Sequence, residues 1–121
     1  MSAFPTNPTQ RSEFNPRLLA SGLLTATDTA LYTCPSDRRC AITAIVFCSV
    51  SATAATFRLH HVVPWNTSTT GNAQYYDSRL NANAVLIDQT PRWLDSGDEL
   101  RGRSTAANTA SFAIYGNESG A

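Results

Sequence analysis

The stretch that decides the fold class covers residues 40–50 and reads CAITAIVFCSV. Every second residue from Cys40 to Val50 is apolar, and Ile45 and Phe47 add apolar side chains between them. Successive side chains of a β-strand point to opposite faces, so these residues place apolar groups on both faces. We therefore predict a strand that is covered on both sides and lies centrally in a sheet.

The segments on both sides of this stretch also favour strands. Short runs rich in Thr, Val, Ile, Phe and Tyr alternate with Gly, Pro, Asn, Asp and Ser, and no helical period is sustained. Gly97 permits the positive φ of a tight turn. The predicted strands cover residues 29–33, 40–50, 55–63, 74–80, 84–88, 99–104 and 111–116, with a further short segment at 92–94. About eight strands predict an all-β protein, an antiparallel β-sandwich or jelly roll formed by residues 23–121.

The predicted core draws on the apolar side chains of several of these strands. Its members are Ile42, Ile45, Val46, Phe47, Phe57, Leu59, Leu86, Leu100, Phe112 and Ile114.

Residues 1–22 have a different composition. Pro5, Pro8 and Pro16 are spaced among polar residues, and the few apolar side chains cannot form a core. We predict an extended N-terminal arm that binds neighbouring subunits, because its apolar groups are not needed by the sandwich. The predicted contact residues of the arm are Phe4, Phe14, Arg17, Leu18 and Leu19.

Charge and hydropathy argue against several classes of partner. The chain has 121 residues, the size of one domain, and its nine acidic and nine basic residues cancel. A nucleic-acid partner is not expected without a basic surface. The longest apolar run, Ala44–Cys48, is far shorter than the roughly 20 residues that cross a bilayer, so no membrane partner is expected. The polar start lacks the apolar segment of a secretory signal, so we expect synthesis in a cytoplasm.

The three cysteines leave two alternatives open. Cys34 and Cys40 flank a short turn and could face each other across a hairpin closely enough for a disulfide. Reduced thiols are the default for a protein made in a cytoplasm, which favours the unbridged form. Cys48 is expected to be a small buried apolar residue.

The chain offers no recognisable catalytic or metal-binding motif. His60 and His61 are adjacent in a predicted strand, so they face opposite sides and cannot ligate one metal; we expect a hydrogen-bonded inward His61 and a solvated His60. Asp95, Asp98 and Glu99 lack the ligand pattern of a calcium loop and suit a turn. No nucleophile motif or phosphate loop is present. We therefore expect neither an enzyme nor a cofactor.

Four segments resemble small β-sandwich structural proteins of tailed bacteriophages. They are residues 30–42 (ALYTCPSDRRCAI), 54–61 (AATFRLHH), 94–100 (LDSGDEL) and 114–118 (IYGNE). The resemblance covers about residues 23–118 and leaves the arm outside. Such sandwiches occur as capsid decoration proteins and as tail-associated components, which implies a non-catalytic virion role. The two cysteines of the turn depart from the pattern of the group, where a Gly-Lys type of turn is commoner.

The expected function is that of a capsid decoration (cement) protein. It would bind the outer surface of the assembled head, as a homotrimer, and staple adjacent major capsid subunits with residues 1–22. Its expected location is the virion, after synthesis in the host cytoplasm. One alternative is a tail or neck component. Another is a receptor-binding or carbohydrate-binding module that uses Trp65, Tyr75, Tyr76 and Trp93 as stacking aromatics.

Overall fold

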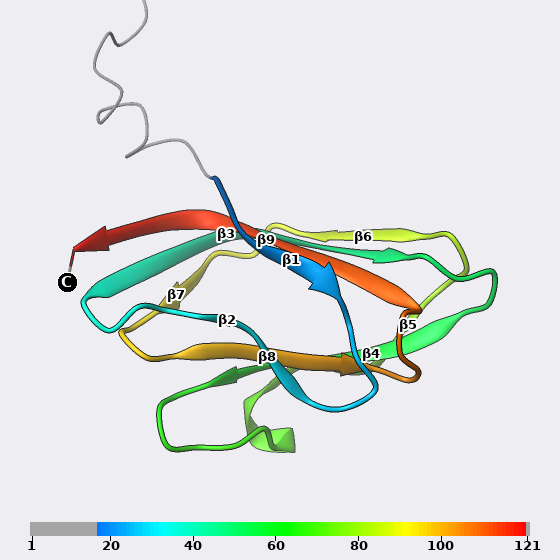
Figure 1. Cartoon of the computed structure of the whole chain (residues 1–121), viewed down its shortest axis with the longest axis horizontal. Helices are drawn as coiled ribbons and strands as arrows, with labels where there is room; N and C mark the ends of the chain where they lie inside the picture. The colour runs from blue at the N-terminus through cyan, green and yellow to red at the C-terminus, as the bar shows by residue number, and fades with distance from the viewer. Residues whose placement is uncertain (1–16, 121) are drawn as a thin grey trace, which may run out of the picture.

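The computed structural model describes residues 17–120, which form nine antiparallel strands and one short 3-10 helix, η1 (Figure 1). The strands are β1 (Arg17–Leu23), β2 (Thr29–Thr33), β3 (Arg38–Ser49), β4 (Ala55–Val62), β5 (Ala73–Leu80), β6 (Val85–Asp88), β7 (Arg92–Leu94), β8 (Glu99–Ser104) and β9 (Ala110–Gly120). The helix η1 covers Thr70–Asn72. Within residues 17–120, no helix is long and apolar enough to cross a membrane.

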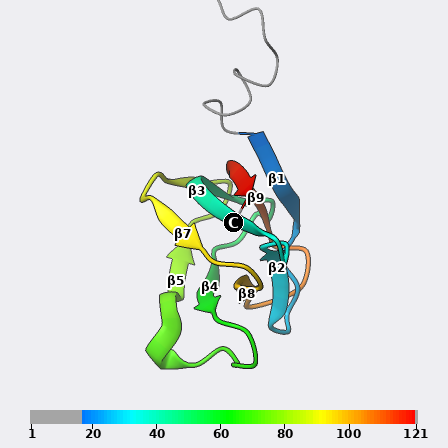
Figure 2. The same ribbon diagram turned by 90° about the vertical axis from the view of Figure 1, so that its left-hand side faces the viewer.

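The strands form two sheets that pack face to face, as the end-on view shows (Figure 2). One sheet has the order β1-β9-β3-β6, with β7 also paired to β3, and the other has the order β2-β8-β4-β5. When the short β7 is set aside, the first strand pairs with the last, the second with the next to last, and so on inward to β4 and β5. This is the strand order of a jelly roll, which confirms the predicted fold class.

The core lies between the two sheets. The rings of Phe47 and Phe57 come from opposite sheets and have centroids 4.4 Å apart, and Tyr75 packs against Phe57 with centroids 5.1 Å apart. Of the ten predicted core residues, eight are buried and Leu86 packs against them in part. Val46 is the exception, because its side chain faces outward.

A β-bulge explains the outward position of Val46. The register between β3 and β9 shifts between Ile42 and Ala44, so one extra residue reverses the direction of every later side chain. Cys40 and Ile42 face the core before the shift, and Ile45 and Phe47 face it afterwards. The predicted alternation from Cys40 to Val50 is therefore wrong beyond Thr43. The central position of β3, between β9 and β6, is confirmed. The predicted covering of both its sides is wrong for residues 17–120, because the outward side chains of Ala44, Val46 and Cys48 are only half-buried.

In the structure, the C-terminal end of the predicted arm is a strand of the sandwich. Residues 17–22 belong to β1, which pairs along β9 from Arg17 opposite Gly116 to Leu23 opposite Ser111. A bulge between Leu18 and Ala20 breaks the alternation, so the sequence of this strand lacks a period of two. Residues 1–16 of the predicted arm lie outside the described residues.

The turn after β2 joins the two sheets, so the predicted hairpin of β2 and β3 is wrong. β2 pairs with β8, whereas β3 pairs with β9, β6 and β7. The turn is held by the loop before β8, since Cys34 donates its backbone N–H to Asp98 O at 2.9 Å and accepts one from Gly97 at 3.0 Å. Gly97 has a φ of 85°, as the predicted tight turn requires.

Candidate functional site

The outer side of the five-stranded sheet is apolar and free of charge over most of its width. The pairing register puts Val46 beside Ala113 and Ile87, and Ala44 beside Tyr115. We call this surface the apolar face; it consists of Leu18, Ser21, Leu23, Ala44, Val46, Cys48, Val85, Ile87, Ser111, Ala113 and Tyr115. None of these side chains carries a charge.

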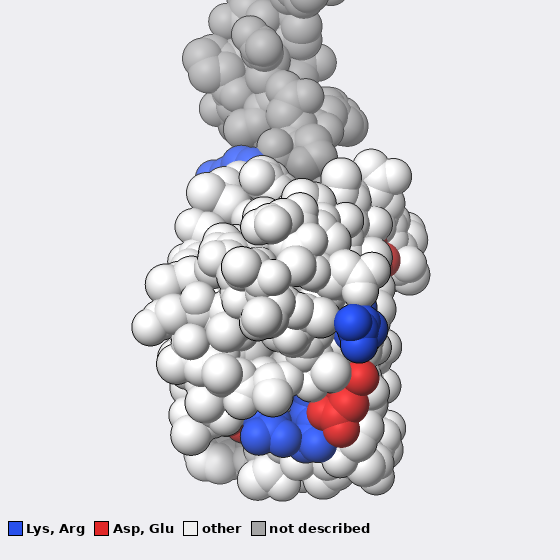
Figure 3. Space-filling view, turned by 90° about the vertical axis from the view of Figure 1, so that its right-hand side faces the viewer, with Lys and Arg blue, Asp and Glu red and all other residues white. Residues whose placement is uncertain are grey.

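Within residues 17–120, the two edges of this face are exposed and its centre, on β3 and β9, is half-buried. Val85 and Ile87 in β6 are 57% and 59% exposed, and Leu18 at the opposite edge is 52% exposed. An end view shows most of the charged side chains on the lower half of the molecule, and the upper part, which the five-stranded sheet occupies, is white except for a blue group at the top and a red group at the right edge (Figure 3). Contiguous apolar surface is typical of interaction sites, so this face is a candidate for one.

The predicted contact residues of the arm have different positions. Leu18 lies on the apolar face, whereas Leu19 packs against the core and is only partly available to a partner. The guanidinium of Arg17 donates to Glu118 Oε1 at 3.2 Å, which ties the start of β1 to β9. Phe4 and Phe14 lie outside the described residues.

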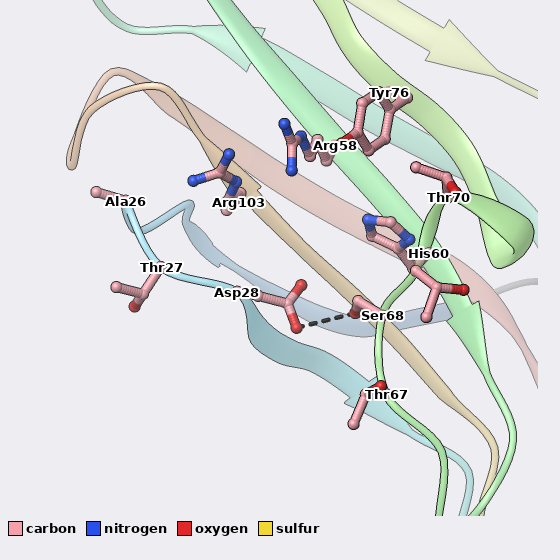
Figure 4. A pocket seen from close by; sticks show the side chains of 11 residues that line it. Ala26, Thr27, Asp28, Arg58, His60, Thr67, Ser68, Thr70, Tyr76 and Arg103 are labelled. Atoms are coloured by element: carbon pink, nitrogen blue, oxygen red, sulfur yellow. Dashed lines mark hydrogen bonds between the residues drawn. The ribbon is translucent and has the colours of Figure 1, made fainter.

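The four-stranded sheet carries a polar pocket on its outer side. The pocket is a hollow of about 540 Å³ between this sheet and the segments before β2 and before β5. Its lining residues are Ala26, Thr27, Asp28, Arg58, His60, Thr67, Ser68, Thr69, Thr70, Tyr76 and Arg103. Figure 4 shows the side chains of Asp28, Arg58, His60 and Arg103 around its open centre.

Two arginines from neighbouring strands lie side by side in this pocket. Arg58 in β4 is directly opposite Arg103 in β8. Arg58 is held by Asp77, with Nε to Oδ1 at 2.7 Å and Nη2 to Oδ2 at 3.0 Å, and its guanidinium lies 4.0 Å from the centre of the Tyr76 ring. The hydrogen bonds from Arg58 lower the pKa of Asp77. Within residues 17–120, Arg103 has neither a hydrogen bond nor an ion pair.

His60 is buried, so the prediction of a solvated side chain is wrong. It is only 3% exposed, because the loop that leads into η1 covers this end of β4. Its Nδ1 lies 2.9 Å from Asn72 Oδ1, which also accepts the backbone N–H of Thr69, while Asn72 Nδ2 donates to Thr67 O. These contacts fix the Asn72 amide and make His60 Nδ1 the donor. Nε2 is then an acceptor in the neutral ring, and it has no partner among the described residues.

His61 behaves as predicted. Its Nε2 lies 3.0 Å from Asp98 Oδ2, on the side of β4 opposite to His60. Asp98 also accepts the backbone N–H of Asp95 at 3.1 Å, so its carboxylate closes the turn that holds Gly97. Within residues 17–120, no three His, Cys, Asp or Glu side chains are grouped to hold a metal ion.

The four aromatics proposed for stacking do not form one platform. Tyr75 belongs to the core, and its hydroxyl donates to Asp88 Oδ2 at 2.6 Å. Trp93 is in β7 of the five-stranded sheet, whereas Tyr76 is in β5 of the other sheet. Trp65 is fully exposed in the loop after β4. Of the four, Tyr76 lines the polar pocket.

Cys34 and Cys40 meet between the sheets although they are not in a hairpin. Both are buried free thiols, and their Sγ atoms lie 2.7 Å apart. The Tyr32 hydroxyl lies 3.1 Å from Cys40 Sγ and hydrogen-bonds to Glu118. Burial, and then the contact with Cys40, raises the pKa of Cys34 to about 12. Cys48 is half-buried on the apolar face, because the β3 bulge turns it away from the predicted buried position.

Comparisons with known proteins give little further information. No protein-family model matches the sequence, and no curated protein matches it. Among solved structures, the chain is similar to one described as "Structure of infectious bursal disease virus Gx strain", with a TM-score of 0.43 and 12% identity. The similarity covers 84% of this chain but only 32% of that one, so this chain spans about a third of its length. At this identity and TM-score, the likeness bears on neither family nor function.

Proposed function

We propose that this protein is a structural component of a tailed-bacteriophage virion, and specifically a capsid decoration (cement) protein. The apolar face is the observation that carries this proposal, because a wide uncharged sheet surface is suited to permanent contact with other subunits. The four phage-like segments and the jelly-roll fold support it, since viral capsid domains are among the proteins that use this fold. The proposed action is binding, without catalysis.

In this proposal the apolar face docks on the major capsid protein of the assembled head, and residues 1–16 staple neighbouring subunits. β1 joins the two contacts, because Leu18 and Leu23 are part of the apolar face and the arm enters β1 at Arg17. A protein that binds only the assembled state stabilises it by RT ln(1 + [L]/Kd) at each site, and the effect is multiplied over many sites. We propose a homotrimer as the bound form.

The copy number in purified particles separates the head from the tail. Quantitative mass spectrometry of the virion should find hundreds of copies if the protein decorates the head. A few copies, or a few dozen, would instead support the alternative of a tail or neck component and would overturn the decoration role.

The docking surface is tested with a charge placed on it. Val85→Asp combined with Ile87→Asp should lower the occupancy of heads that lack the protein by about tenfold or more, because buried unpaired charges are costly. Val63→Asp is a matched control, since Val63 is 47% exposed and follows β4 in the other sheet. Equal occupancy by the double variant and the control would show that the apolar face is not the docking surface.

A receptor-binding or carbohydrate-binding role remains the second candidate. The polar pocket on the four-stranded sheet favours it, whereas the four aromatics together do not.

A further inference from the structure

We propose that the polar pocket binds a saccharide that carries a carboxylate, with the carboxylate held by Arg103. This inference goes beyond the virion role and does not depend on it, because the pocket and the apolar face lie on opposite sheets.

The arrangement of charge in the pocket calls for an anion. Directly opposed like charges on neighbouring strands are unfavourable, and Arg58 and Arg103 are such a pair. Asp77 compensates Arg58 through two hydrogen bonds. Asp28 is compensated in turn by Arg101, whose Nε donates to its Oδ2 at 2.8 Å. The half-buried Arg103 shares the charge of Asp77 only at a distance, since within residues 17–120 it has no hydrogen bond or ion pair of its own, and its planar guanidinium matches a carboxylate.

The rest of the lining is suited to hydroxyl groups. His60 is more than nine-tenths buried, its Nε2 has no hydrogen-bond partner within residues 17–120, and its ring faces the pocket (Figure 4). Asp28 Oδ1 likewise accepts no hydrogen bond from the described residues, since Ser68 and Arg101 both donate to Oδ2. Thr27, Thr67 and Thr70 also line the pocket, and within residues 17–120 their hydroxyls make no hydrogen bond. Sugar hydroxyls both donate and accept, so they can satisfy all of these groups.

The size and rigidity of the pocket fit a small ligand. A hollow of about 540 Å³ falls within the range of roughly 300 to 1,000 Å³ for ligand pockets. It has room for one or two sugar rings. The contacts of Arg58 with Asp77 and of His60 with Asn72 hold both side chains in place before any ligand binds. Such preorganisation reduces the cost of binding.

The proposal is tested by titrating the full chain with D-glucuronate and with N-acetylneuraminate, followed by NMR and calorimetry. At least one of them should bind about tenfold more tightly than D-glucose, which lacks the carboxylate, and than acetate, which lacks the hydroxyls. If acetate binds as well as the acidic sugars, the pocket is a simple anion site and the saccharide assignment is wrong. If neither acidic sugar binds, the proposal is overturned.

Two probe variants and one control test whether the sugar binds in the polar pocket. Arg103→Gln should weaken binding of the acidic sugar about tenfold or more, because it removes the charge but keeps a similar size. Arg79→Gln is the matched control, since Arg79 lies in β5 outside the pocket and should leave binding unchanged. Asp28→Asn is a second probe and should weaken the acidic sugar and glucose alike. Unaltered binding by Arg103→Gln would refute the assignment of the carboxylate.

Discussion

Gly116 lies where β9 is flanked by β1 and by the bulged part of β3. A Cβ at this position would overlap the carbonyl oxygen of Ala41, a backbone atom that can move only if β3 and β9 separate. We predict that Gly116→Ala lowers the free energy of unfolding by about 3 kcal/mol or more, measured by urea denaturation. Gly120→Ala in the same strand should have little effect, since no atom lies within 4 Å of its Cβ. Equal stability of the two variants would contradict the tight pairing.

Asp88 is a buried carboxylate whose charge is supported from three sides. Arg92 Nη2 lies 2.7 Å from its Oδ2, Tyr75 donates to the same oxygen, and the Thr90 N–H donates to Oδ1 at 2.9 Å. Burial alone would raise the pKa of Asp88, but the hydrogen bonds from Arg92, Tyr75 and Thr90 together hold it well below its usual range. Both partners of the ion pair are nearly buried, so breaking it leaves Arg92 uncompensated.

The lowered pKa of Asp88 determines how the stability contributed by the Asp88–Arg92 pair depends on pH. The carboxyl has a pKa of about 3.9 in the unfolded chain, so the pair stabilises the fold fully above that pH and loses its effect as the pH falls through the lower folded pKa. Asp88→Asn should therefore cost about 3 to 5 kcal/mol at pH 7 and reduce the loss of stability below about pH 4. Guanidinium denaturation at pH 7 and below about pH 4 measures the free energy of unfolding of the variant and of the natural chain. Asp37→Asn is the control, since the Asp37 side chain is exposed. An Asp88→Asn variant that loses stability in acid as steeply as the natural chain would disprove it.

At the scale of the elements, local sequence pattern predicted most strands. It predicted neither the direction of the side chains beyond the β3 bulge nor which side chains are buried by distant loops. Thr29–Thr33 and Glu99–Ser104 have the predicted bounds, because period-two residues and turn residues are local signals. The β3 bulge depends on the pairing with β9, so no local sequence signal near Thr43 indicates it. Burial of His60 likewise depends on Asn72, twelve positions later. The pairing of Arg58 with Arg103 follows from the β4–β8 register, which explains why the polar pocket was not predicted.

The connection between β2 and β3 gives a prediction about thiol reactivity. Cys34 and Cys40 are buried and the pKa of Cys34 is raised to about 12, so the reactive thiolate of Cys34 is rare at neutral pH. In the folded protein, iodoacetamide should modify Cys48 well before Cys34 and Cys40, as peptide mass spectrometry can show. A mild disulfide oxidant should then produce a bridge between Cys34 and Cys40, with a mass loss of two hydrogens. Equal alkylation rates for all three thiols, or oxidation that involves Cys48, would contradict this arrangement.

The whole molecule presents two chemically different surfaces on its two sheets. The five-stranded sheet offers an apolar face for a large partner, and the four-stranded sheet offers the polar pocket for a small one. Within residues 17–120, buried side chains from both sheets form the core between them. We therefore expect that contacts on one sheet can be changed without altering the other.

This separation predicts different effects of two N-terminal deletions. Removing residues 1–16 should leave the melting temperature of the isolated protein almost unchanged, as should Phe4→Ala combined with Phe14→Ala, because residues 17–120 supply both sheets and the buried cluster between them. Removing residues 1–23 takes away β1 and should lower the melting temperature by about 10 °C or more, since β9 loses a paired neighbour and Leu19 and Ala20 no longer pack against the core. Both the shorter deletion and the double alanine variant should bind heads poorly if the arm staples subunits. If the shorter deletion lowered the melting temperature as much as the longer one, the arm would fold back on its own sandwich and stapling would have to be abandoned.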